Sequence, residues 1–139
     1  MIRVPVDNDV VLDFILKRPP FNVEAKEIFA GAGRGEIEIF VSAITPINAF
    51  CTTRKEKGKD IAFRAVEGLL KLVEIAGTDK QVFQNAFTLN YTDYEDAVQC
   101  ASALAENLDA IVTRNAKDYK NSSIKIYSPS AFLQFLQTV

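Results

Sequence analysis

The chain has 139 residues, of which 48% are hydrophobic and 24% are charged, so it is suited to one compact domain with its own core, and its composition argues against disorder. Its net charge is −2, whereas a protein that coats nucleic acid needs a basic excess. It contains no histidine, which argues against a zinc centre and favours oxygen-ligated cations. We expect a single domain over residues 1–139.

Short apolar runs alternate with amphipathic segments along the chain. The runs predict strands at residues 2–6, 38–42, 73–76, 110–113 and 124–127. The amphipathic segments predict helices at 9–17, 23–32, 45–57, 60–72, 79–89 and 92–108, and a last helix that opens at Ser128-Pro129. This alternation predicts a three-layer α/β/α sandwich with a central, mainly parallel sheet. Pro5 is disfavoured in a central strand, so the first strand is expected to be short or bent.

Helix starts and cysteines give further local expectations. Thr45 is predicted to be an N-cap before Pro46, and Thr92 and Glu95 have the spacing of a capping box. Cys51 and Cys100 fall inside helical patterns and are predicted to be buried free thiols. The chain has no apolar stretch long enough to span a membrane, and its first residues lack the apolar segment of a signal peptide. We therefore expect no membrane association and a cytoplasmic location.

Acidic residues stand where strands end or helices begin. Asp7, with Asp9 close behind it, follows the first strand; it is either a helix N-cap or part of a site at the carboxyl edge of the sheet, and the two roles are compatible. Asp93 and Asp96 lie at the start of a helix and project to one side. Since the Thr92 pair already provides a cap, Asp96 beside an apolar face is the strongest single candidate for a site residue.

The loop after the fourth strand is polar. It contains Thr113, Asn115 and Asp118, which offer oxygen atoms at a strand's carboxyl end, although such a segment is more often only a polar loop. Asp109 lies at the amino end of the same strand and is interpreted as structural. Carboxylates at strand ends favour Mg²⁺ or Mn²⁺, and hydrolysis of phosphodiester bonds is the leading hypothesis.

Sequence blocks spread over nearly the whole chain resemble the PIN domain, the metal-dependent ribonuclease fold of many bacterial toxins. Residues 6–13 (VDNDVVLD) resemble the family's opening block, usually written D-T-N-V-L-L-D. Residues 41–45 (VSAIT), 94–99 (YEDAVQ) and 111–119 (IVTRNAKDY) resemble the second, third and fourth blocks in the expected order. The resemblance implies a PIN-like fold and a toxin-type ribonuclease of a toxin–antitoxin system.

The resemblance also assigns roles to residues of this chain. It places the first and third catalytic carboxylates on Asp7 and Asp96, and the fourth position on Asn115, with Asp118 as its substitute or supplement. The second position, normally Glu, is Asn48, so this chain resembles a branch with Asn in place of the second acidic residue. An amide can ligate a metal or orient a water, but it brings no charge. The resemblance implies that Mg²⁺ or Mn²⁺ is bound by Asp7, Asp96, Asp118 and Asn115. It implies supporting roles for Asp9, Thr45, Asp93 and Thr113.

Three functional hypotheses follow. The first is a metal-dependent endoribonuclease acting on single-stranded or structured RNA, with an antitoxin protein and a homodimer implied by the resemblance. The second is a catalytically weak PIN domain that binds RNA or a protein, because Asn48 replaces the Glu. The third is a receiver-like signalling domain, which needs a phosphoacceptor Asp at the end of a central strand; the strand at 38–42 ends in Ser-Ala-Ile-Thr, so this hypothesis is set aside.

Overall fold

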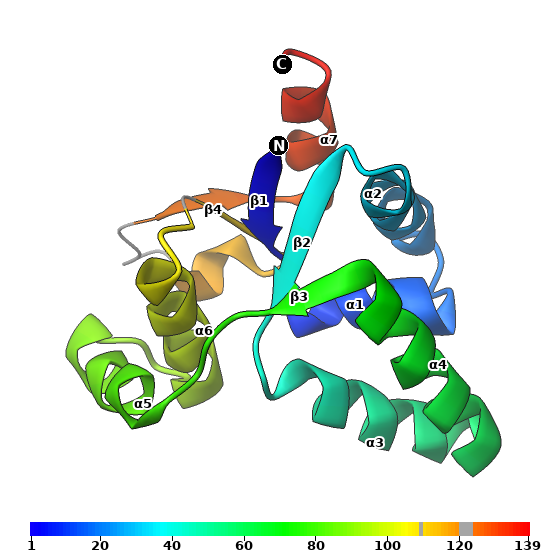
Figure 1. Cartoon of the computed structure of the whole chain (residues 1–139), viewed down its shortest axis with the longest axis horizontal. Helices are drawn as coiled ribbons and strands as arrows, with labels where there is room; N and C mark the ends of the chain where they lie inside the picture. The colour runs from blue at the N-terminus through cyan, green and yellow to red at the C-terminus, as the bar shows by residue number, and fades with distance from the viewer. Residues whose placement is uncertain (109, 120–123) are drawn as a thin grey trace.

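The computed structural model describes residues 1–108, 110–119 and 124–139, and in these ranges helices cover both faces of a parallel sheet (Figure 1). The strands are β1 (Ile2–Pro5), β2 (Ile37–Val41), β3 (Val73–Ile75), β4 (Ala110–Val112) and β5 (Lys125–Tyr127). The helices are α1 (Asn8–Leu16), α2 (Asn22–Gly33), α3 (Thr45–Lys57), α4 (Lys59–Leu72), α5 (Lys80–Ala86), α6 (Tyr94–Ala105) and α7 (Pro129–Leu136), with short 3-10 helices η1 (Phe87–Leu89) and η2 (Ala116–Tyr119). The predicted α/β/α sandwich is confirmed.

Alternation along the strands decides which layer each side chain joins. Val4 and Val6 pack into the larger core cluster with residues of α1, α2 and α7. Phe40 and Ile111 point to the other face and pack with residues of α6. Successive residues of a strand face opposite sides of the sheet, and here the residues on both sides are apolar. Apolar residues on both faces are expected where helices cover a parallel sheet on both sides.

The strands form two parallel sheets, β1-β2-β3 and β4-β5, joined by one bridge between Val6 and Val112. The reason is Pro5. The backbone N–H of Asp7 donates to the carbonyl of Val112 at 2.9 Å, and alternate residues of a strand face the same neighbour. The residue that would extend this pairing is Pro5, which has no N–H. The first strand is short, as expected from Pro5, and ends at that residue. The missing N–H accounts for the division between β1 and β4.

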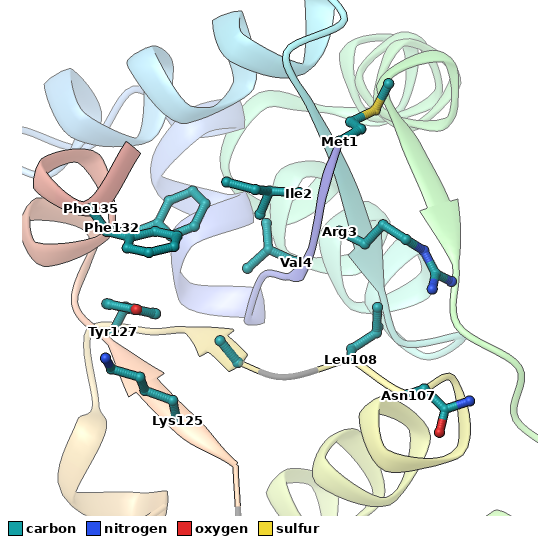
Figure 2. Close-up of a pocket in the computed structure, with 11 residues that line it drawn as sticks. Met1, Ile2, Arg3, Val4, Asn107, Leu108, Lys125, Tyr127, Phe132 and Phe135 are labelled. Carbon is teal, nitrogen blue, oxygen red and sulfur yellow. The ribbon is translucent and has the colours of Figure 1, made fainter. Parts of the chain in front are cut away.

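The division leaves a hollow between β1 and β4 at the amino end of the sheet. Its volume is about 360 Å³, and its walls include Val4, Tyr127, Phe132 and Phe135. Figure 2 shows the rings of Phe132 and Phe135 on α7 beside the side chains of β1, with Lys125 and Tyr127 of β5 below them. The acidic residues that follow β1 lie beyond the opposite, carboxyl end of that strand, so this hollow is separate from them.

Local signals placed most helix boundaries correctly, but three predictions were wrong. Thr45 is the first residue of α3 rather than its N-cap, and its buried hydroxyl has no hydrogen-bond partner within the described part of the chain. The cap of α6 is Asp93, whose side chain accepts from the Asp96 N–H at 3.0 Å, so the Thr92–Glu95 capping box does not form. Cys51 is exposed, although Cys100 is buried as predicted, and neither forms a disulfide within the described residues. Asp109 lies outside the described residues.

None of the described helices is both long and apolar enough to cross a membrane.

Candidate active site

Asp7 is held at the carboxyl end of β1 by donors from two sides. Its Oδ1 accepts from the backbone N–H of Asn8 at 2.7 Å, so it caps α1. Its Oδ2 accepts from the hydroxyls of Thr113 at 2.8 Å and Tyr119 at 3.1 Å. Only 7% of Asp7 is exposed. The capping interpretation is therefore right, and the second oxygen is directed toward the loop that follows β4.

Asp96 reaches the same point from the first turn of α6. Its Oδ1 lies 3.2 Å from the hydroxyl oxygen of Tyr119, which also contacts Asp7. Tyr119 itself is buried. A tyrosine hydroxyl has one proton to donate, so it cannot fully satisfy two carboxylates at once. Two carboxylates that are far apart in the chain thus lie beside one hydroxyl, which can donate its proton to only one of them.

The electrostatics of this pair are unfavourable without a further cation. Burial raises the pKa of Asp7, although hydrogen bonds from Thr113, Asn8 and Tyr119 oppose the rise. Burial, followed by the negative charges of Asp7 and Asp93, raises the pKa of Asp96 to about 7. Burial and the two neighbouring carboxylates also raise the pKa of Tyr119, which keeps its hydroxyl protonated. Over the described residues neither Asp7 nor Asp96 forms a salt bridge.

Asp9 fixes the loop that carries Thr113. Its Oδ2 accepts from the backbone N–H of Arg114 at 3.0 Å and from the side-chain amide of Asn115 at 3.1 Å. Its Oδ1 is buried and has no hydrogen-bond partner among the residues that the structure describes. Burial and the charge of Asp7 raise the pKa of Asp9 to about 6. The Asn115 amide is therefore directed toward Asp9.

An ion pair that the sequence analysis missed supports this loop. Arg114 donates to both oxygens of Asp13, through Nε at 2.7 Å and Nη2 at 3.2 Å. Asp13 is 1% exposed, and the guanidinium carbon lies 3.9 Å from the centre of the Phe21 ring. Both residues stand inside the motif blocks, Asp13 at the end of the first and Arg114 within the fourth. Their positions in the sequence, however, give no indication that the two side chains meet.

The remaining predicted site residues make no direct hydrogen bond to the Asp7 or Asp96 carboxylate in the described part of the chain, apart from the Asp93 cap, which accepts from the backbone N–H of Asp96. Asp118 is exposed on η2, and its charge is among the lesser causes that raise the pKa of Asp7 and Asp96. Asp93 is the cap of α6. Asn48 lies on α3, where its side-chain amide donates to Glu95 at 3.0 Å. Glu95 was not among the predicted site residues, because it was assigned to the capping box that does not form.

A family model for the PIN domain matches residues 3–117. The chain belongs to the PIN domain family. Solved structures with the same fold include a chain of DNA-bound VapBC from Salmonella typhimurium, with 18% identity, 93% of this chain and 99% of that chain covered, and a TM-score of 0.72. A chain of a toxin–antitoxin complex from Klebsiella pneumoniae has 20% identity, 91% and 97% coverage, and a TM-score of 0.68. VapC20 of Mycobacterium tuberculosis, a toxin that cleaves the sarcin–ricin loop, has 12% identity, 78% and 86% coverage, and a TM-score of 0.63. No curated protein matches significantly.

The chemistry of this PIN domain's carboxylates fits a hard divalent cation with few protein ligands. Within the described part of the chain, no three carboxylate or thiol side chains form a ready-made metal site. Mg²⁺, however, is usually held by one or two carboxylates together with substrate phosphates. Asp7 and Asp96 repel each other across one hydroxyl, and the Oδ1 of Asp9 is buried with no hydrogen-bond partner in residues 1–108, 110–119 and 124–139. A cation would relieve this excess of negative charge.

Proposed function

We propose that this PIN domain is a metal-dependent endoribonuclease that hydrolyses RNA phosphodiester bonds, and that it acts as the toxin of a toxin–antitoxin pair. The observation that carries the proposal is the meeting of Asp7 and Asp96 at the Tyr119 hydroxyl, at the carboxyl end of the parallel strands. Membership of the PIN family supports it. So does the likeness of the fold to VapC20, a toxin that cleaves the sarcin–ricin loop.

Each residue has a definite task in this mechanism. Asp7 and Asp96 would hold Mg²⁺ or Mn²⁺, with Asp118 and Asn115 at the edge of the site. A bound cation would lower the pKa of a water molecule and stabilise charge on the phosphate. Thr113 orients Asp7 through its hydroxyl, and Asp9 fixes the loop after β4. No covalent nucleophile from the protein is required.

The test is cleavage of end-labelled RNA, one single-stranded oligonucleotide and one hairpin, in Mn²⁺, in Mg²⁺ and in EDTA. We expect cleavage by the wild type that depends on the metal, and none by Asp96→Asn. Asp60→Asn is the matched control, because Asp60 is an exposed carboxylate in the first turn of α4. Cleavage that survives in Asp96→Asn would remove Asp96 from the site.

A second candidate is a weak or inactive PIN domain that binds RNA or a protein. Asn48 and Asn115 favour it, because two positions that are acidic in the family carry no charge here. Calorimetry with Mn²⁺ distinguishes the two candidates. Absence of binding at millimolar metal would favour the binding module, and clear binding would favour the enzyme.

An exposed apolar groove between α3 and α4 supports a protein partner. It has a volume of about 530 Å³, and its side chains Ile47, Phe63 and Leu70 are 65%, 58% and 48% exposed. Contiguous apolar surface of this kind marks interaction sites. We assign it to an antitoxin segment, in keeping with the toxin–antitoxin complexes that share the fold. A dimer of the chain alone in light scattering would assign the groove to a second copy instead.

A further inference from the structure

One charge of the proposed site is missing from its usual place. Position 48, on the α3 side of the site, carries an amide where the PIN resemblance expects a Glu. An amide oxygen can approach a cation, but it does not offset the cation's charge. The proposed nuclease therefore has a deficit of one negative charge, unless another residue provides it.

A carboxylate from a different element lies at this position. The Oε1 of Glu95 accepts hydrogen bonds from the side-chain amide of Asn48 at 3.0 Å and from that of Asn8 at 2.6 Å. The three residues come from α6, α3 and α1; Asp7 caps α1, and α6 carries Asp96. Asn8 follows Asp7 in the chain, and Glu95 precedes Asp96. The contact therefore joins the chain neighbours of both candidate metal ligands.

Among the described residues, the hydrogen bonds to Asn8 and Asn48 are the side-chain contacts that Glu95 makes. The N-cap of α6 is Asp93, so the helix start does not need the Glu95 side chain. Glu95 is exposed, so it lies at the protein surface, where a cation or a substrate can approach it. Two amides converging on one oxygen also fix the rotation of both amide groups, so that the amide oxygen of Asn48 points away from Glu95.

We propose that Glu95 supplies from the first turn of α6 the negative charge that other PIN domains carry at the position of Asn48. Glu95 acts on the cation through its charge, and it orients Asn48. This inference rests on the proposed metal-dependent function. The competing interpretation is purely structural: Glu95 only fastens α6 to α1 and α3.

Glu95→Gln separates the two interpretations. The glutamine oxygen can still accept from Asn8 and Asn48, so the fastening is kept while the charge is removed. The second variant exchanges the groups, with Asn48→Glu and Glu95→Gln together, which keeps one carboxylate and one amide in the same contact. Glu27→Gln is the control, because Glu27 is an exposed carboxylate on α2 that pairs with Arg34 at the carboxyl end of the same helix.

The measurement is titration of the full chain with Mn²⁺ by calorimetry at pH 7.5, with thermal unfolding in EDTA to verify the fold. We expect Glu95→Gln to weaken Mn²⁺ binding by about tenfold or more, as loss of a residue that supports metal ligands does. The exchanged variant should recover most of that affinity, and Glu27→Gln should bind as the wild type does. If the single variant loses stability, the exchanged variant decides the question.

Three results would overturn the inference. Wild-type affinity in Glu95→Gln would show that the carboxylate only fastens helices, and it would leave the proposed nuclease intact. Weak binding by a folded exchanged variant would show that charge at this contact is not what the cation needs. Failure of the wild type to bind Mn²⁺ would remove both the inference and the metal-dependent function.

Discussion

Replacing Asp96 by Asn should stabilise the metal-free protein at the same time as it abolishes cleavage. The pKa of Asp96 rises from its usual 3.8 to about 7 in the folded state, so the folded protein binds this proton more tightly than the unfolded chain does. Below about pH 4 the group is protonated in both states, and it has no effect. As the pH rises toward 7, the ionised group costs the folded state increasing free energy, and above about pH 7 the cost is complete.

The magnitude follows from the size of the pKa change. A rise to about 7 corresponds to about 4 kcal/mol at about 1.4 kcal/mol per pKa unit. Asp96 is only half-buried, so solvent screening reduces this to about 1–2 kcal/mol. The Asn side chain can still accept from the Tyr119 hydroxyl, and the backbone N–H of residue 96 still donates to the Asp93 cap. The substitution therefore removes charge with little loss of contacts.

The assay is urea unfolding in EDTA at pH 5 and pH 8 for the wild type, Asp96→Asn and Asp60→Asn. Asp96→Asn should be more stable than the wild type by about 1–2 kcal/mol at pH 8. The advantage should shrink at pH 5, while Asp60→Asn should show no such pH trend. Equal stability of Asp96→Asn and the wild type at pH 8 would refute the argument that burial and the charges of Asp7 and Asp93 raise the pKa of Asp96.

One substitution and one chemical modification test other parts of the structure. Arg114→Ala should lower the free energy of unfolding by about 3–5 kcal/mol, because it leaves the buried carboxylate of Asp13 without its partner. Adding Asp13→Asn should recover part of that loss in urea unfolding; a single variant as stable as the wild type would contradict the assignment. With a thiol reagent such as Ellman's, Cys51 should react in the native protein and Cys100 only after unfolding. Two equivalents reacting in native buffer would contradict the burial of Cys100.

Local sequence signals predicted the elements well because their causes are local. Gly58 ends α3, and Ser128 caps α7 through a hydrogen bond to the Ala131 N–H. Signals with two local solutions were less reliable. Thr92 and Asp93 were both able to cap α6, and the structure uses Asp93. That choice released Glu95 to reach Asn8 and Asn48, which the capping-box interpretation had concealed.

The amino-acid sequence by itself determined the alternation of strands and helices, the apolar faces of the sheet and the position of Asp7 at a strand end, because each depends on periodicity or on adjacent residues. Only the tertiary structure decided that Asp7 and Asp96 meet at Tyr119, that Arg114 pairs with Asp13, and that Pro5 divides the sheet. Those contacts join side chains that leave separate elements in directions fixed by packing. Their distances therefore depend on how the layers are assembled, which no spacing along the chain encodes.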